Sequence, residues 1–349
     1  MKNMRQSDPT IHVARTDSPI STQPRQPIFI VGHPRSGTTL LRALLGAHEQ
    51  IHVLNEPDLF MNMRSAGFSI DHRFSADDRR KLINFFRSKR SSNRYLESVD
   101  ENKIKAFLNS TKEASFQETF ESLVQTRNDK PYWGTKSLQN GYFIRDILTV
   151  YPRAIVIPIV RDPRAALLST YRKRLAHSAN CIPKFGREGI AFFSYEAMRW
   201  GAAMDVIHEA RNDADRSALH KVRYESIVTN PESEIRSLCD AIQIPYDPEM
   251  SSVSRRSNDP LLKSTEAYAH RNLSSSIDPS RAAGGKDLPE WASYIINQCA
   301  GETARREGYD FRTKPKLAQR IIIQAGLSAF RSKMQKRLTS ELKNLCGVR

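Results

Sequence analysis

The chain has 349 residues, of which 39% are hydrophobic and 26% are charged. This composition excludes a collagen, a low-complexity repeat and a wholly disordered chain, and the length suits one large domain or two modest ones. Lysine and arginine number 54 against 38 acidic residues, so the formal net charge is +16 at pH 7. That surplus predicts an anionic partner, whether a nucleic acid, an anionic membrane or a phosphorylated small molecule.

Residues 1–26 are polar and predict a flexible arm, without the apolar core of a signal peptide. No apolar run approaches the roughly 18 residues that a membrane-spanning helix needs. The cysteines lie too far apart for a CxxC pair, and the histidines and cysteines form no cluster of metal ligands. We therefore expect a cytoplasmic protein with no metal and with reduced thiols at Cys181, Cys239, Cys299 and Cys346.

The folded part is expected to begin at residues 28–31, a short apolar run typical of a buried parallel strand. Gly32 to Thr39 is a predicted turn, and leucines at helical spacing predict a helix over residues 39–48. The later elements are expected as a mostly helical segment at 57–130, a strand or loop at 132–136, strands at 154–160 and 220–224, and helices from Arg164 and at 232–242. Strands that alternate with helices predict a three-layer α/β fold, with a central parallel sheet and helices on both faces.

The sharpest local motif is the loop Gly32-His33-Pro34-Arg35-Ser36-Gly37-Thr38-Thr39 between the first strand and helix. Such a loop points backbone N–H groups and the positive end of a helix dipole at an anion. Its two glycines have Walker A spacing, but Thr38 stands where that motif has its phosphate-binding lysine. The loop therefore favours one terminal anionic group over a magnesium-bound triphosphate. The alternative interpretation is an ordinary glycine-bearing turn.

A second group of polar residues follows the strand at 154–160. Arg161 would stand at its carboxyl end, where ligands bind in parallel sheets, with its guanidinium directed at a phosphate. Ser169 lies two helical turns further along and could reach the same anion. Alone this pair is weak evidence, because Arg161 and Asp162 after a strand could form a local ion pair. Pro158 is unusual inside this strand, because proline removes a hydrogen-bond donor.

These motifs together resemble a known family. The segments PRSGTTLLRALLGAH, VRDPRAALLSTYRKR and VRYESIVTNPESEIRSLCDAIQIPYDP are similar, in order and spacing, to the sulfotransferases that use 3′-phosphoadenosine 5′-phosphosulfate (PAPS). The likeness spans residues 28–311. It implies a P-loop-like α/β fold, PAPS as the co-substrate and no metal requirement.

The resemblance also implies roles for individual residues. The loop would hold the 5′-phosphosulfate end of the nucleotide through Arg35, Ser36, Gly37, Thr38 and Thr39. The 3′-phosphate would be held by Arg161 and Ser169 with Lys173, and Tyr224 would lie near the nucleotide. The family's late basic loop is degenerate here, and Arg281 or Lys286 is the best match.

Sulfuryl transfer needs a base for the acceptor's proton and cations for the charge on the leaving phosphate. Glu56, after the strand expected at residues 51–55, resembles the base of the branch that includes the tyrosylprotein and many bacterial sulfotransferases. The alternative for Glu56 is a carboxylate at a helix N-terminus. Lys136 resembles the lysine that contacts the transferring sulfonate, and its alternative is a solvated loop lysine. His33 and His52 are interpreted as structural.

Two other functions compete with the sulfotransferase. A P-loop small-molecule kinase is disfavoured by the missing Walker lysine, and a nucleic-acid-binding protein by the lack of a recognition motif. We expect no nucleic-acid partner. The acceptor stays open between a small molecule, a glycan, a lipid and a peptide, with residues 57–130 and 175–200 lining its pocket.

The sequence divides into an arm at 1–26, a sulfotransferase domain at 27–311 and a basic tail at 312–349. The tail has ten Lys/Arg and one acid, Glu341, for a net charge of +9. An apolar stripe at helical spacing predicts an amphipathic helix through Leu327, Phe330, Met334, Leu338, Leu342 and Leu345. We expect the stripe to pack on the domain or on a second subunit of a homodimer; the alternative is peripheral contact with an anionic membrane.

Overall fold

The computed structural model of the chain describes residues 27–55, 58–88, 101–110, 112–125, 130, 132–176, 181–213, 218–257 and 271–346. The expected N-terminal arm at 1–26 and the residue Glu56 lie outside this part of the chain.

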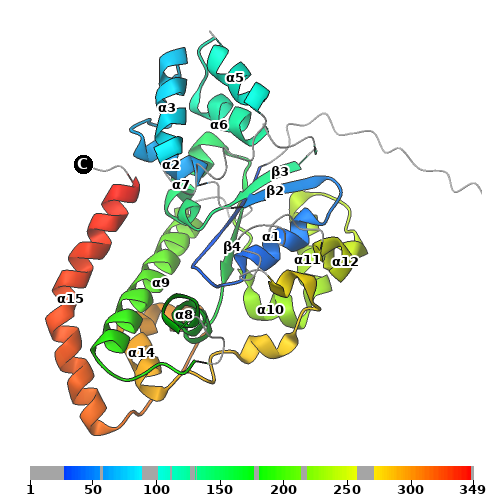
Figure 1. Cartoon of the computed structure of the whole chain (residues 1–349). Helices are drawn as coiled ribbons and strands as arrows, with labels where there is room; N and C mark the ends of the chain where they lie inside the picture. Colours follow the sequence, from blue (N-terminus) through cyan, green and yellow to red (C-terminus); the bar gives the residue numbers. More distant parts are fainter. Residues whose placement is uncertain are drawn as a thin grey trace, which may run out of the picture.

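A parallel sheet of five strands forms the centre, in the order β2-β3-β1-β4-β5 (Figure 1). Its strands are β1 (Ile28–Gly32), β2 (Ile51–Asn55), β3 (Tyr132–Lys136), β4 (Ile155–Val160) and β5 (Val222–Arg223). The segment at 132–136 is therefore a strand, paired with both β1 and β2. The strand expected at 220–224 shrinks to two residues, because Tyr224 already begins a helix.

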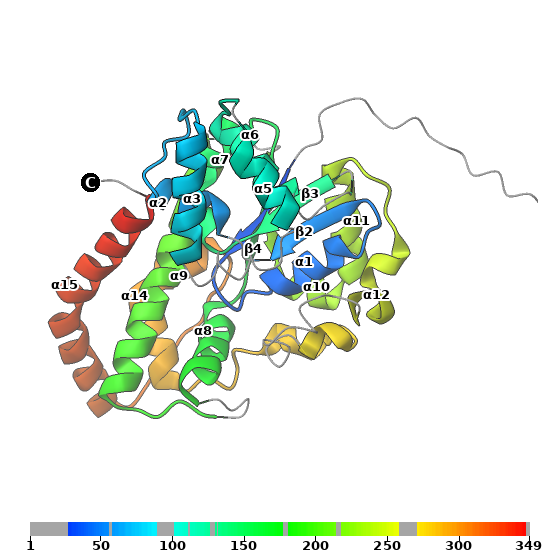
Figure 2. The same ribbon diagram turned by 45° about the horizontal axis from the view of Figure 1, so that its top comes forward.

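Helices cover both faces of the sheet (Figure 2), which confirms the predicted three-layer α/β fold. The α-helices are α1 (Thr38–Gly46), α2 (Leu59–Ser65), α3 (Ala76–Ser88), α5 (Glu101–Asn109), α6 (Phe116–Gln125), α7 (Ile144–Val150), α8 (Pro163–Tyr171), α9 (Arg187–Asp213), α10 (Tyr224–Thr229), α11 (Pro231–Ile242), α12 (Val253–Ser257), α14 (Glu290–Arg306) and α15 (Leu317–Cys346). Short 3₁₀ segments are η1 (Gln139–Phe143), η4 (Pro248–Ser251), η6 (Arg271–Ser274) and η7 (Pro279–Ala283), and η2 (Arg172–Ala176) is a π-helical turn.

Alternation along the strands builds two cores. Ile28 and Ile30 of β1 point to the layer of α1, α10 and α11, whereas Phe29 and Val31 point to the layer that contains α9 and α14. All four side chains are fully buried. Successive side chains of a strand face opposite sides of a sheet, so a strand covered on both sides must be apolar throughout.

Pro158 is tolerated in β4 because of the direction in which its nitrogen faces. The carbonyl of Val156, two residues earlier, accepts a hydrogen bond from the N–H of His220, on the side of the short strand β5. Backbone polar groups two residues apart point to the same side of a strand, so the Pro158 nitrogen also faces the β5 side. Proline belongs where a strand has little to pair with, and β5 pairs only with the last two residues of β4.

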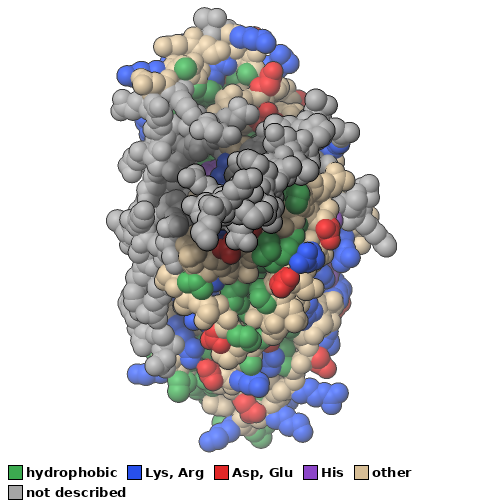
Figure 3. Space-filling model, turned by 90° about the vertical axis from the view of Figure 1, so that its right-hand side faces the viewer, with side chains coloured by type: hydrophobic (Ala, Val, Ile, Leu, Met, Phe, Trp, Pro, Cys, Tyr) green, Lys and Arg blue, Asp and Glu red, His purple; other side chains and the backbone are tan. Residues whose placement is uncertain are grey.

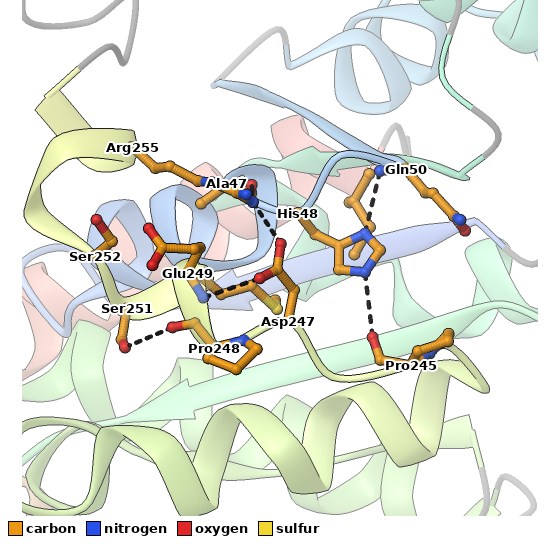
Figure 4. Close-up of polar contacts among 12 residues, drawn as sticks. Ala47, His48, Gln50, Pro245, Asp247, Pro248, Glu249, Ser251, Ser252 and Arg255 are labelled. Carbon is orange, nitrogen blue, oxygen red and sulfur yellow. Dashed lines mark hydrogen bonds and ion pairs between the residues drawn. The ribbon is translucent and has the colours of Figure 1, made fainter. Parts of the chain in front are cut away.

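At the far end of α1 from the glycine loop, a set of hydrogen bonds joins this helix to the segment after α11 (Figure 4). His48 Nε2 donates to the carbonyl of Pro245 over 3.2 Å, and Nδ1 accepts from the N–H of Gln50 over 3.1 Å. The Arg255 guanidinium donates to the carbonyl of Ala47 and pairs with Asp247. These contacts fix the end of the sheet opposite the loop.

The C-terminal helix α15 lies along the outside of α9 and reaches α2 (Figure 1). Ile323 is fully buried, and Leu327, the first residue of the expected apolar stripe, packs against the larger core. The side chains of the other stripe residues lie outside the described set: Phe330, Met334, Leu338, Leu342 and Leu345. Within the described part of the chain, no helix is both long and apolar enough to cross a membrane.

Candidate active site

The glycine loop between β1 and α1 holds two residues in left-handed backbone conformation, Arg35 (φ 67°) and Gly37 (φ 96°). A Cβ atom on Gly37 would lie 2.3 Å from Cδ2 of Tyr224, so only glycine fits there. No side chain caps α1, which begins directly after Gly37. The first-turn N–H groups of a helix have no intrahelical partner, so this uncapped end suits an anion.

Arg161 connects this loop to two other parts of the chain. Its guanidinium donates to the carbonyl of Arg35 over 3.0 Å and to the carbonyl of Arg281 over 3.4 Å. It also lies 4.0 Å from the centre of the Tyr224 ring, a cation–π distance. Burial is the main reason that the pKa of Arg161 falls below its ordinary value. No carboxylate among the described residues forms an ion pair with Arg161, so the local ion pair with Asp162 is not formed.

Asp162 has a different role. It caps α8 by accepting the N–H of Arg164 over 2.8 Å, and it pairs with the Arg164 guanidinium over 2.6 Å. Asp162 in turn donates its N–H to Glu225 over 3.0 Å. These contacts hold the start of α8 and leave Arg161 directed at the loop.

Ser36 Oγ and Arg161 Nε are among the buried polar atoms of this region that have no hydrogen-bond partner. Buried polar groups are normally satisfied, so each unsatisfied one requires an explanation. Both belong to residues expected to bind phosphate oxygens, and a bound anion would satisfy them. In the same loop Thr38 is buried and Thr39 is half-buried.

The residues expected around the 3′-phosphate fall into two groups. Arg35 Nε donates to Ser169 Oγ over 3.1 Å, so the loop and α8 are in direct contact. Lys173 lies in η2 with its side chain exposed. The structure thus brings Arg35, Arg161, Ser169 and Tyr224 together.

The expected late loop contacts Arg161 mainly through its backbone. Arg281 lies in η7, where its carbonyl accepts from Arg161 and its side chain pairs with Asp278 over 3.4 Å. A Cβ atom on Gly285 would lie 2.9 Å from Cβ of Arg164, so the glycines after η7 allow close packing on α8. Lys286 is exposed.

On the other side of the loop, Lys136 ends β3 and is 1% exposed. Its ammonium donates to Oδ1 of Asn55, the last residue of β2, over 3.2 Å. The next residue, Ser137, donates its hydroxyl to Asp58 over 2.6 Å. Lys136 is therefore a buried strand residue, and the alternative of a solvated loop lysine is wrong. Asn55 was missed in the sequence, because only the pairing of β2 with β3 places it beside a lysine.

A buried carboxylate on α9 was also missed in the sequence. Glu196 is 1% exposed and forms ion pairs with Arg174 of η2 over 2.5 Å and with Arg199 over 3.4 Å. The only sequence signal was a lone acid in the otherwise apolar run of α9, IAFFSYEAM. Glu196 therefore ties η2 to α9 next to the loop.

Glu196 also lies 3.8 Å from Nε2 of His33. Burial and then the Arg199 charge lower the pKa of His33 to about 3, so its imidazole is neutral at pH 7 and does not form an ion pair with Glu196. A base this weak favours the structural interpretation of His33. His52 pairs in register with Trp133 in the body of β2, three residues before the strand ends.

Comparison with known proteins supports the family resemblance seen in the sequence motifs. The profile of the sulfotransferase family matches residues 27–248. The chain belongs to the sulfotransferase family. Protein-tyrosine sulfotransferase A of Caenorhabditis elegans is 23% identical over 231 residues, covering 63% of this chain and 50% of that protein. The protein-tyrosine sulfotransferase of Drosophila melanogaster is 25% identical over 228 residues, covering 63% of this chain and 38% of that protein.

The chain thus spans half or less of the length of these two relatives. Among solved structures, the sulfotransferase domain of the Synechococcus PCC 7002 olefin synthase has a similar fold, with a TM-score of 0.55 and 20% identity. That match covers 84% of this chain and 98% of the domain. The solved domain supports the P-loop-like α/β fold expected from the sequence.

Proposed function

We propose that this chain transfers a sulfonate from PAPS to a hydroxyl or amine of an acceptor. The observation that carries the proposal is Arg161, a largely buried cation beside the uncapped end of α1, with a buried Nε that lacks a partner. A site of this kind suits a nucleotide with an anionic group at each of two positions. We assign the 5′-phosphosulfate to the loop residues Arg35, Ser36, Gly37, Thr38 and Thr39.

The 3′-phosphate is assigned to Arg161 and Ser169 with Lys173, and the nucleotide also contacts Tyr224. Arg281 or Lys286 would close over it from the late loop. The strand order supports one orientation of the nucleotide, because Arg161 follows β4 on one side of the loop and Lys136 ends β3 on the other. A nucleotide whose 3′-phosphate lies at Arg161 would therefore direct its reacting end toward β3 and β2.

The acceptor chemistry is assigned to that side. Lys136 would stabilise charge on the transferring group, and Glu56, which follows β2 in the sequence, would take the proton of the acceptor. Two relatives are named protein-tyrosine sulfotransferases, which supports including a peptide tyrosine among the candidate acceptors, beside a small molecule, a glycan and a lipid. A panel of acceptors from these four classes, with labelled donor, distinguishes them. A cytoplasmic location and a reaction without a metal stay predictions from the sequence.

A nucleotide-binding experiment tests the site itself. Adenosine 3′,5′-bisphosphate should raise the melting temperature without magnesium, and Arg161→Ala should weaken its binding by about 1.5–3 kcal/mol, roughly 10- to 150-fold. Adenosine 5′-phosphate lacks the 3′-phosphate, so Arg161→Ala should lower its binding affinity much less. Arg236→Ala is the control, because that exposed arginine pairs with Glu232 on α11.

Equal losses for the two nucleotides would remove the 3′-phosphate from Arg161. Stabilisation by ATP with magnesium, but not by adenosine 3′,5′-bisphosphate, would favour the P-loop kinase.

A further inference from the structure

The first turns of α15 carry an apolar surface that the fold does not use. Leu317 is 70% exposed, Ile321 is 62% exposed and Ile322 is 50% exposed. At about 100° per residue, these three side chains fall within an arc of roughly 140° on one side of the helix. Aliphatic side chains so exposed, and gathered on one arc, call for an explanation that scattered surface leucines do not.

The rotation of α15 about its own axis is fixed by its other side. Ile323 is fully buried and Leu327 packs against the larger core. Gln324 donates its side-chain amide to the hydroxyl of Tyr294 on α14 over 2.9 Å. The helix lies on α9 and α14 (Figure 2), so the apolar arc faces away from the molecule.

The segment of chain that carries this arc has cations as its only charged residues. The exposed charged residues of the segment 312–328 are Arg312, Lys314, Lys316 and Arg320, and the segment contains no acid. Elsewhere the surface is mixed: on the described part of the face in Figure 3, acidic, basic and hydrophobic side chains are interspersed. Aliphatic side chains beside unopposed cations are the pattern of helices that bind anionic membrane surfaces.

We propose that these seven residues, the α15 patch, dock the protein on the surface of an anionic lipid membrane. The aliphatic side chains would enter the headgroup region while the lysines and arginines contact lipid phosphates and carboxylates. The proposal does not depend on the proposed sulfonate transfer.

A second copy of the chain fits the patch less well. A two-fold symmetric contact places the same surface on both sides, so the four cations of one copy would face those of the other. Three aliphatic side chains also supply only a fraction of the roughly 800 Å² that each partner buries in a stable interface. The charge pattern therefore favours an anionic partner.

Flotation of the full chain with phosphatidylcholine vesicles, with and without phosphatidylserine, tests the proposal. We expect binding only to the anionic vesicles and its loss in high salt. The double variant Ile321→Ser/Ile322→Ser should bind at least about tenfold more weakly. The control Val253→Ser changes an aliphatic residue of α12 that is 38% exposed and should bind like the wild type. Lys316→Glu/Arg320→Glu should also lose binding.

Both substituted isoleucines are exposed, so an unchanged melting temperature of each variant serves as the folding control. Failure of the wild type to float with anionic vesicles would overturn the proposal. Unchanged flotation of the isoleucine variant would overturn it as well, by reducing the interaction to net charge. Light scattering that shows a dimer which the isoleucine variant abolishes would assign the patch to a second copy instead.

Discussion

At the scale of single residues, the site depends on the contacts of the Tyr224 ring with Gly37 on one side and with Arg161 on the other. Gly37 has no side chain, which lets the Tyr224 ring approach the loop. The ring lies against the Arg161 guanidinium, which holds the carbonyl of Arg35. The three partners come from the glycine loop, the start of α10 and the residue after β4, so a change at Gly37 acts on Arg161 through Tyr224.

Gly37→Ala should therefore remove binding of adenosine 3′,5′-bisphosphate and destabilise the fold. Gly67→Ala is a matched control, because Gly67 has a similar positive φ of 91° but an added Cβ would have no atom within 4 Å. The control should lower the free energy of unfolding only by the strain of a left-handed alanine, about 1–2 kcal/mol, and should keep nucleotide binding. Thermal shift with and without nucleotide measures both effects. Equal costs at the two glycines would show that the contact with Tyr224 does not matter.

Glu56→Gln should keep nucleotide affinity and lower turnover by on the order of 10²- to 10⁴-fold, because it preserves shape and removes the proton acceptor. Glu49→Gln is the control, since Glu49 is an exposed acid just before β2 and Glu56 follows that strand. Turnover of the true acceptor with labelled donor is the measurement. Near-normal turnover by Glu56→Gln would move the base to another residue.

At the scale of elements, apolar continuity predicted the central strands well. The runs at 28–31 and 154–160 lie buried on both faces, and the structure has them as β1 and β4. The weak elements were less predictable. Residues 132–136 read as strand or loop because a glycine and a lysine interrupt the apolar pattern, yet Gly134 is needed where the carbonyl of Ile28 would lie 2.6 Å from a Cβ. Partners distant in sequence, such as those of Glu196, have no sequence signature.

The element-scale prediction concerns that carboxylate. Glu196→Ala should destabilise the protein by about 3 kcal/mol, because it leaves Arg174 and the largely buried Arg199 without their counter-ion. Glu232→Ala, which breaks the exposed pair with Arg236 on α11, should cost less than about 0.5 kcal/mol. Urea unfolding at pH 7 measures both. Similar small costs would mean that Glu196 does not hold η2 against α9.

At the scale of the whole molecule, the strand order decides what the site can contain. The sequence predicted that polar residues follow several strands, but not that β3 enters between β1 and β2 and places Lys136 beside Asn55. The order of strands is set by long-range packing, which local patterns do not encode. A buried histidine lies beyond each end of the sheet: His33 follows β1 in the loop, and His48 follows α1 at the opposite end.

These two histidines predict loss of stability in acid. Burial is the largest cause that lowers both pKa values, that of His33 to about 3, with Arg199 and Arg174 adding to the effect there and Lys130 at His48. As the pH falls below about 6.5, these histidines become protonated in the unfolded chain but stay neutral in the folded chain. Their contribution to the free energy of unfolding is therefore complete above about pH 6.5 and falls as the pH drops toward 3. His33 alone should cost on the order of 4 kcal/mol over that range. Urea unfolding between pH 7.5 and about pH 4.5 covers the first two pH units of this loss, on the order of 3 kcal/mol for His33. His33→Gln, which cannot titrate, should flatten the pH dependence. Identical slopes for variant and wild type would assign the acid sensitivity to other groups.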